Sequence, residues 1–470
     1  MRLFVFVSVA VLVSIVSSGV SGEDTRPNIV FVMADDLGKE WLSVYGAEDH
    51  ATPRLDRMAA EGMLFTNAYS TPKCTPTRVQ LLTAMYPFRT GWVNHWDVPR
   101  WGAGCHFDAE EYTTFAEVMR MAGYATAAAG KWQINDFRVQ PTAMHDHGFD
   151  DWCMWTGGET DGPAKPLRYW EPYINTPEGS RTWEGRYGPD VFNDFVIEFL
   201  GRQGDKPAMV YYPMALPHTP LVTTPHEPDV TTKREKLRAM VGYVDYLMGR
   251  LLDAIEAMDS GRPTIVIFTT DNGSAGGQKM RMNGRAVTPG KGRLTENGSN
   301  APFIVWGPGL VPPGVTSHAL TDFSDMLPTF AELGGARVPS DLEIDGQSIA
   351  PVILGEAVDG PREWIMSMGG GVAVLTEEGR IRPEVGYAPR VVRDERFKMY
   401  FTDGMPAKLI DLVEDPQEKV DLMASVDPVV VAAREKLAAA GQTFPETDAW
   451  PRYTPTLPQP WDVVPGEVSR

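Results

Sequence analysis

The stretch from Asn28 to Asp36, NIVFVMADD, joins an unbroken apolar run to two adjacent carboxylates. A short apolar run of this kind, ended by polar residues, is typical of a β-strand buried on both faces of a sheet. Similar short runs recur along the chain, at 124–129, 208–214, 264–269 and 303–306. Segments with helical periodicity lie among them, at 112–121 and 233–258. This alternation predicts an α/β fold with a large mixed, mostly parallel sheet sandwiched by helices.

Polar side chains follow four of these runs, at the point where each predicted strand ends. They are Asp35 and Asp36, Lys131 and Gln133, His218, and Asp271 and Asn272. The carboxyl ends of parallel strands meet at one edge of a sheet, where ligands bind in open α/β folds. Close carboxylates in a dry site repel each other unless a cation compensates them, and oxygen ligands suit calcium or magnesium better than zinc. The residues therefore predict a hard-cation site made by Asp35, Asp36, Asp271 and Asn272.

The chain has only three cysteines, Cys74, Cys105 and Cys153. This number excludes a disulfide scaffold, and no C-x-x-C pair indicates zinc or thioredoxin chemistry. Cys74 precedes a predicted helix and Arg78 follows one turn later, so the helix N-terminus and the guanidinium both favour an anion there. From these residues alone, Cys74 is either a buried structural cysteine or part of an anion site.

The segment Cys74-Thr-Pro-Thr-Arg78 resembles the C-x-P-x-R motif of the sulfatases, the formylglycine-dependent branch of the alkaline-phosphatase superfamily. Further motifs match that family in its own order, at 35–36, 130–132, 217–220, 271–273 and 290–292. Segments 392–400 and 409–418 resemble its small C-terminal subdomain, so that the resemblance covers residues 26–440. It implies an alkaline-phosphatase-like core followed by a subdomain with an antiparallel sheet and a helix.

The resemblance also implies a role for each site residue. Cys74 would be oxidised to formylglycine (3-oxoalanine) by a formylglycine-generating maturation enzyme, and the hydrate of the aldehyde would be the nucleophile. The predicted metal ligands are Asp35, Asp36, Asp271, Asn272 and the modified Cys74, with calcium as the first choice of ion and magnesium as the second. Cys105 and Cys153 would then be the only two thiols left to form a disulfide.

The remaining roles concern the sulfate group. Arg78 would hold the hydrate, Lys131 and Lys291 would bind the sulfate oxygens, and His218 would protonate the leaving alcohol. The predicted catalytic residues are thus Cys74, Arg78, His218, Lys131 and Lys291, and the predicted substrate-binding residues are Lys131, Lys291, His218 and Gln133. One hydroxyl of the hydrate would attack sulfur, and the other would expel sulfate and restore the aldehyde.

Three positions depart from the pattern of the family. Gln133 stands where many relatives have histidine, and it can donate a hydrogen bond to the hydrate but cannot take up a proton near neutral pH. The run from Leu82 to Met85, LTAM, replaces the usual Leu-Thr-Gly-Arg, and this change is expected to weaken recognition by the maturation enzyme. Asn300 stands where relatives often carry an arginine.

The sequence also predicts export of the protein and a division of the chain into two domains. Residues 1–22 combine a positive Arg2, an apolar run and small residues, which is typical of a cleaved signal peptide; an uncleaved anchor is the alternative. The apolar run is short for a bilayer span, so we expect no stable membrane insertion. We expect a periplasmic or secreted protein, or a lysosomal or extracellular one in a eukaryote. Residues 23–360 are predicted to form the catalytic domain, and residues 361–470 a C-terminal subdomain ending in a proline-rich tail.

The overall charge limits the partners. With 43 basic and 62 acidic residues the net charge is −19, which argues against binding to nucleic acid. An anionic substrate must therefore be held by a small, locally positive pocket. Residues 152–187 are rich in aromatic residues, glycine and proline and are predicted to form a surface insertion. Tryptophans gather in the N-terminal half of the chain, among them Trp92, Trp96, Trp101, Trp152, Trp155, Trp170 and Trp183. Each could either stack on a sugar ring of the substrate or cover the sheet as part of the core.

The predicted function is hydrolysis of sulfate monoesters. The substrate would be a sulfated small molecule or a sulfated saccharide, with sulfated carbohydrates as the first choice. Two alternatives remain open at this point. One is a phosphonate-monoester or phosphodiester hydrolase that uses the same nucleophile. The other is a non-catalytic glycan-binding protein on the same scaffold, against which the intact set of predicted metal ligands and the C-x-P-x-R motif argue.

Overall fold

The structure, a computed structural model, describes residues 25–94, 106–157, 167–258, 261–276, 278–369, 386–454 and 457. The predicted signal peptide, Cys105, Trp96 and Trp101 lie outside these ranges. Within the described ranges, no helix is both long enough and apolar enough to cross a bilayer.

Ten strands of the described chain form one large sheet. In spatial order they are β12 (Val315–Asp322), β2 (Met63–Tyr69), β11 (Asn300–Trp306), β8 (Thr264–Thr270), β1 (Asn28–Ala34), β7 (Ala208–Pro213), β3 (Ala125–Lys131), β4 (Asp151–Trp155), β5 (Tyr173–Thr176) and β6 (Gly179–Thr182). Strand β11 is antiparallel to both neighbours, and β4, β5 and β6 pair antiparallel, whereas the other pairs are parallel. The prediction of a large mixed, mostly parallel sheet is confirmed.

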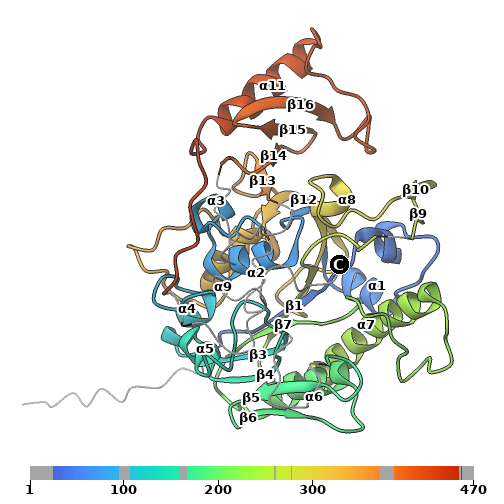
Figure 1. Cartoon of the computed structure of the whole chain (residues 1–470), viewed down its shortest axis with the longest axis vertical. Coiled ribbons are helices and arrows are strands. Elements are labelled where there is room, and N and C mark those ends of the chain that lie inside the picture. Colours follow the sequence, from blue (N-terminus) through green and yellow to red (C-terminus); the bar gives the residue numbers. More distant parts are fainter. Residues whose placement is uncertain are drawn as a thin grey trace, which may run out of the picture.

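Helices cover both faces of this sheet (Figure 1). Helices α2 (Cys74–Thr83), α4 (Phe115–Met121) and α9 (Met326–Leu333) pack on one face, and α1 (Pro53–Ala60), α6 (Gly188–Gly201) and α7 (Lys233–Glu256) pack on the other. The alternation of side chains along β1 divides it between the two cores: Ile29 and Phe31 point to the first, and Val30 and Val32 to the second. A strand buried on both faces explains why NIVFVM is apolar at every position.

Two features of the main sheet differ from the sequence prediction. Strands β2 and β12 were not predicted, because polar residues such as Asn67 and Thr321 interrupt their apolar pattern. The segment 152–187 is not simply a surface insertion, since it supplies most of β4 and all of β5 and β6. Trp152 and Trp155 are buried in β4 and belong to the sheet.

A second, four-stranded antiparallel sheet follows in the chain (Figure 1). Its strands are β13 (Ile365–Met368), β14 (Arg390–Arg393), β15 (Phe397–Thr402) and β16 (Met405–Asp411), and helix α11 (Pro428–Gly441) lies against it. Residues 390–402 form a hairpin of two strands, β14 and β15, and the Asp427 side chain caps α11 by accepting hydrogen bonds from the Val429 and Val430 amides. The domain boundary at 360 stays a prediction.

Shorter elements connect these parts of the fold. They are 3-10 helices η1 (Lys39–Trp41), η2 (Ser43–Tyr45) and η3 (Phe323–Asp325), helices α3 (Pro87–Thr90), α5 (Ala143–Asp146), α8 (Glu296–Ser299) and α10 (Ala350–Ile353), and strands β9 (Met280–Met282) and β10 (Arg285–Val287).

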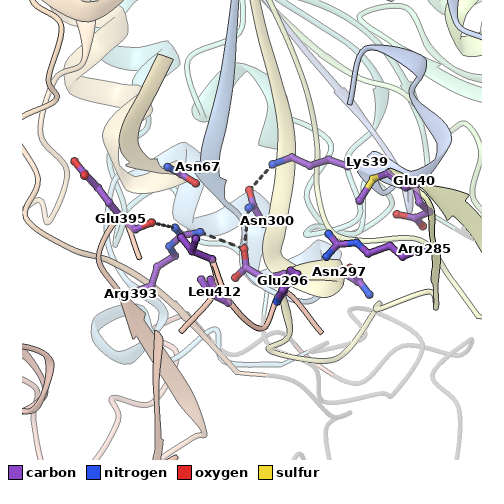
Figure 2. A pocket seen from close by; sticks show the side chains of 13 residues that line it. Lys39, Glu40, Asn67, Arg285, Glu296, Asn297, Asn300, Arg393, Glu395 and Leu412 are labelled. Carbon is purple, nitrogen blue, oxygen red and sulfur yellow. Dashed lines mark hydrogen bonds and ion pairs between the residues drawn. The ribbon is translucent and has the colours of Figure 1, made fainter. Parts of the chain in front are cut away.

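A cluster of charged residues joins the two sheets. Glu296, at the start of α8, accepts hydrogen bonds from Lys398 at 3.0 Å and from Arg393 at 3.2 Å, and both donors come from the second sheet. The cluster borders a cavity of about 280 Å³, where Figure 2 shows Glu296 facing Arg393 and Lys39 reaching Asn300. None of the predicted catalytic residues lines this cavity. This cavity is therefore distinct from the predicted catalytic site and lies at the junction between the two sheets.

Candidate active site

Four adjacent parallel strands, in the order β8, β1, β7 and β3, bring the predicted site residues to one edge of the main sheet. The backbone holds the first turns after these strands together: the Asp35 amide donates to the Leu216 carbonyl at 2.8 Å, and the Asp271 amide to the Ala34 carbonyl at 3.0 Å. The Asp36 amide in turn donates to Oδ1 of Asp271 at 3.0 Å. The sequence correctly predicted which strand ends meet.

Helix α2 begins with Cys74, which is buried, and is anchored against these strand ends. The Thr77 hydroxyl donates to the Asp271 carbonyl at 2.8 Å. The Arg78 guanidinium donates to the Lys131 carbonyl at 2.6 Å and to Oδ2 of Asp271 at 3.1 Å. These contacts hold the N-terminus of α2 over the acidic cluster. The helix ends at Ala84 with a left-handed φ of 59°, a position that glycine usually fills.

Two lysines face the carboxylates from different parts of the chain. Nζ of Lys131 is 2.5 Å from Oδ2 of Asp35, and Nζ of Lys291 is 2.5 Å from Oδ1 of Asp36. Burial would raise the pKa of Asp35, but Lys131, His218 and Arg78 outweigh it and hold this pKa well below its ordinary value. Burial would lower the pKa of Lys291, but the negative charges of Cys74, Asp36 and Asp35 raise it. Lys291 is thus held in its positive form, and its electrostatic interaction with Cys74 places it near the start of α2.

His218 lies at the entrance to this cluster, with its two ring nitrogens in different surroundings. Nε2 is 3.6 Å from Oδ2 of Asp36. Nδ1 is 2.8 Å from the Thr219 carbonyl and 3.2 Å from Nη1 of Arg168. Burial and the positive charge of Lys131 lower the pKa of His218. The Thr219 carbonyl can only accept and the Arg168 guanidinium can only donate, so these two contacts require opposite proton states of Nδ1 and do not assign the tautomer.

The acidic cluster fits a divalent cation. Oδ1 of Asp35 and Oδ1 of Asn272 are buried and have no hydrogen-bond partner, so both are available as ligands. Burial and the negative charge of Asp35 raise the pKa of Asp271 well above its ordinary value, which is the repulsion that a cation would relieve. Ligand atoms of Asp35, Asp36 and His218 lie within 4.8 Å of one another, so His218 borders the same position.

Two site residues were not predicted from the sequence. Lys73 is the N-cap of α2, and its side chain runs close to Gly292, beside Lys291. Burial and Lys291 lower the pKa of Lys73, although Cys74 opposes them. Arg168 lies beside His218. The place of Lys73 next to the C-x-P-x-R motif was a signal that could have identified it, whereas Arg168 lies between β4 and β5, where no motif points to it.

The remaining predicted contacts have mixed outcomes. Gln133 follows β3 with a left-handed φ of 68° and is half-buried, and its role as a substrate ligand stays a prediction. Trp92, Trp152 and Trp155 are buried in the core and cannot stack on a sugar, whereas Trp170 is 38% exposed. Cys153 is a free, buried cysteine in β4.

A doubly wound α/β sheet with an acidic cluster, two lysines and a buried cysteine at its carboxyl edge defines the class of the molecule. The family model described as Sulfatase matches residues 27–336, and the chain belongs to the sulfatase family. It is a sulfuric ester hydrolase of the arylsulfatase-like type with the alkaline-phosphatase-like fold.

Individual relatives agree with this assignment. The chain is 32% identical to the N-acetylgalactosamine-6-sulfatase of Homo sapiens over 369 residues, which are 73% of this chain and 69% of that protein. It is 30% identical to the arylsulfatase A of Bos taurus over 465 residues, which are 88% of this chain and 86% of that protein. Among solved structures, Ps i-CgsB superposes with a TM-score of 0.73 at 24% identity, covering 91% of this chain and 94% of the other. At that identity the superposition shows a shared fold.

Proposed function

We propose that the protein hydrolyses sulfate monoesters of sulfated carbohydrates, with Cys74 converted to formylglycine and a divalent cation, calcium before magnesium, at the acidic cluster. The observation that carries the proposal is the position of Cys74 at the N-terminus of α2, above Asp271 and beside Lys291. The carbohydrate part is supported by relatives named N-acetylgalactosamine-6-sulfatase and by a structure of similar fold, with a TM-score of 0.68, described in complex with its substrate D-glucosamine-2-N,6-O-disulfate.

Each residue of the site has a proposed role in binding the sulfate ester or in transferring a proton. Lys131 and Lys291 are cations within reach of a sulfate placed above Asp35 and Asp36, and they stabilise charge on the sulfate oxygens. Arg78 holds the hydrated aldehyde at position 74, one hydroxyl of which attacks sulfur. His218 delivers a proton to the departing alcohol oxygen. When bound, the cation would supply Lewis-acid stabilisation of the sulfate and of the nucleophile oxygen.

Mass spectrometry of the peptide that contains Cys74 tests the proposed modification. We expect an aldehyde in place of the thiol when the protein is produced together with a formylglycine-generating enzyme. The peptide that contains Cys153 is the internal control, because this buried cysteine in β4 should keep its thiol. An unmodified Cys74 in a preparation that is fully active would contradict the proposal.

Steady-state kinetics test the reaction. We expect hydrolysis of a sulfated saccharide panel and of an aryl sulfate, and a much lower kcat/KM on the matching aryl phosphonate monoester. Treatment with a chelator should abolish the activity, and calcium should restore it better than magnesium. A preference for the phosphonate would assign the enzyme to the other branch of formylglycine chemistry.

Export is the last part of the proposal. N-terminal sequencing of the mature protein is expected to begin after residue 22, and the protein should be recovered outside the cytoplasm. Retention of residues 1–22 in a membrane fraction would favour an uncleaved anchor.

A further inference from the structure

Arg168 is a positive charge beside the predicted general acid, outside the group of residues that face the sulfate. It lies between β4 and β5 and is half-buried. Its guanidinium carbon is 3.9 Å from the centroid of the Trp155 ring, and its Nη1 is 3.2 Å from Nδ1 of His218. The buried indole therefore supports the guanidinium, and stacking of this kind restricts where an arginine can point.

The surroundings of the His218 ring show which part of a substrate Arg168 can reach. The Nε2 edge is 3.6 Å from Asp36 and faces the acidic cluster, where the sulfate would lie. Arg168 contacts the Nδ1 edge of the ring. An alcohol that receives a proton from His218 must lie next to this ring. Substituents of the alcohol, rather than the scissile sulfate, are therefore what Arg168 can contact.

Arg168 also differs from several other buried or half-buried arginines of the fold in its ion pairing. Arg362 is paired with Asp325 at 2.5 Å and Arg393 with Glu296 at 3.2 Å. Among the described residues, Arg168 has no carboxylate within ion-pair distance; its contacts are the Trp155 ring and the His218 imidazole. Since a guanidinium stays charged and presents several donors in one plane, most of its donors remain available for an anion.

The geometry points to Arg168 as a specificity-determining residue that binds a second anionic group, a carboxylate or a further sulfate, on the saccharide that carries the scissile ester. This inference rests on the proposed sulfatase function and adds the charge of the leaving group to it. Trp155 contributes by holding the guanidinium rather than by stacking on a sugar. A local anion site of this kind also lets a chain of net charge −19 select a polyanionic saccharide.

Two pairs of matched substrates test the inference on the mature enzyme. The first pair is a sulfated disaccharide with a uronic acid and the same disaccharide with that carboxylate reduced to an alcohol. The second is a disulfated monosaccharide and its monosulfated counterpart. We expect the wild-type enzyme to prefer the doubly anionic member of at least one pair tenfold or more in kcat/KM. Whether the uronate pair or the disulfate pair shows the preference identifies the anion.

Variants then assign the preference to Arg168. Arg168→Gln is expected to reduce the ratio of kcat/KM values within the pair at least tenfold, mainly through KM, and Arg168→Lys to reduce it less. Arg181→Gln is the matched control, because Arg181 also lies over an indole, 4.6 Å from the Trp183 centroid, in the same region of the chain. The control should keep the wild-type ratio.

The outcomes separate this inference from the proposed function. An equal loss on both members of a pair would overturn it, because Arg168 would then act only through His218. A wild-type enzyme that hydrolyses sulfate esters without preferring either doubly anionic substrate would also overturn it while leaving the sulfatase function intact. A wild-type enzyme with no activity on any sulfate ester would instead contradict the proposed function.

Discussion

Two buried clusters of charged residues in this protein are made of the same groups and differ in how completely those groups are paired. At the edge of the main sheet, Asp35, Asp36 and Asp271 face Arg78, Lys131 and Lys291. At the junction of the two sheets, Glu296 and Glu418 face Arg393 and Lys398. Both clusters are charged and largely inaccessible to water, so burial alone does not distinguish a reactive site from a structural one.

The difference lies in the carboxylate oxygens that remain without a partner. Both oxygens of Glu296 accept hydrogen bonds, one from Lys398 and Tyr69 and the other from Asn300 and Arg393. At the sheet edge, Oδ1 of Asp35 has no partner. An incompletely satisfied cluster retains ligands for a cation and a substrate, whereas a complete one stabilises the fold. Changes in the first cluster should therefore lower activity, and changes in the second should lower stability.

The largest effect is expected at Cys74, the source of the nucleophile in the proposed mechanism. Cys74→Ala should reduce turnover at least about a thousandfold, because the nucleophile is lost, while the midpoint of thermal unfolding changes little. Cys153→Ala, which alters another buried cysteine, should retain activity. Steady-state rates and a thermal melt on each variant provide the measurement. Normal turnover in Cys74→Ala would remove the basis for treating the first cluster as catalytic.

Lys398→Met is expected to show the opposite behaviour. Nζ of Lys398 is 3.0 Å from Glu296 and 2.9 Å from Glu418, so its loss removes a cationic partner from two buried carboxylates at once. We expect the free energy of unfolding to fall by about 3–5 kcal/mol, measured by denaturant titration. Activity per folded molecule should stay close to that of the wild type. Lys436→Met, at a half-exposed lysine of α11, is the control and should change stability by less than about 0.5 kcal/mol.

Lys131→Ala should lower kcat/KM about a hundred- to a thousandfold, because the proposed mechanism then loses one donor to the sulfate oxygens. Lys233→Ala, at the exposed start of α7, is the control. Near-UV circular dichroism of both variants checks that the fold is retained. A loss of less than threefold would mean that Lys131 neutralises Asp35 without contributing to catalysis.

The smallest effect concerns pH. Burial would raise the pKa of Glu296, but Lys398 and Arg393 outweigh it and lower this pKa from 4.5 to about 2. A depressed carboxyl pKa stabilises the folded state above pH 4.5, and this stabilisation is lost as the pH falls towards 2. The loss should amount to at most about 3 kcal/mol. Glu296→Gln should flatten the decline in unfolding free energy over this range, and an unchanged slope would exclude Glu296 as its source.

The parts of the fold that the sequence predicts are those with a strong local pattern. Strands β1, β7 and β8 are buried on both faces and read as continuous apolar runs, so their ends and the polar residues after them could be placed. Strand β2 has polar residues such as Thr66 and Asn67 inside it, and its place between β11 and β12 depends on segments more than 200 residues away. Pairing at that distance leaves no local signal.

The candidate site divides in the same way. Asp35 and Asp271 could be predicted because each directly follows a strand, His218 because it lies in the loop after β7, and Cys74 and Arg78 because they share one helical turn. Arg168 could not be predicted, since its position depends on stacking against Trp155 and on the approach of His218 from another strand end. The sequence also could not show that the tryptophans of this region are mostly buried.

The burial of helix α2 has a consequence for the order of events during biosynthesis. Every residue from Cys74 to Thr83 is buried, and the contacts that hold the helix come from Lys131 and from Asp271, nearly 200 residues later in the chain. On the proposed modification, a maturation enzyme can reach the thiol only before Asp271 and its neighbours have docked. The time available for making the nucleophile is therefore set by how quickly the C-terminal half of the sheet is synthesised and folds.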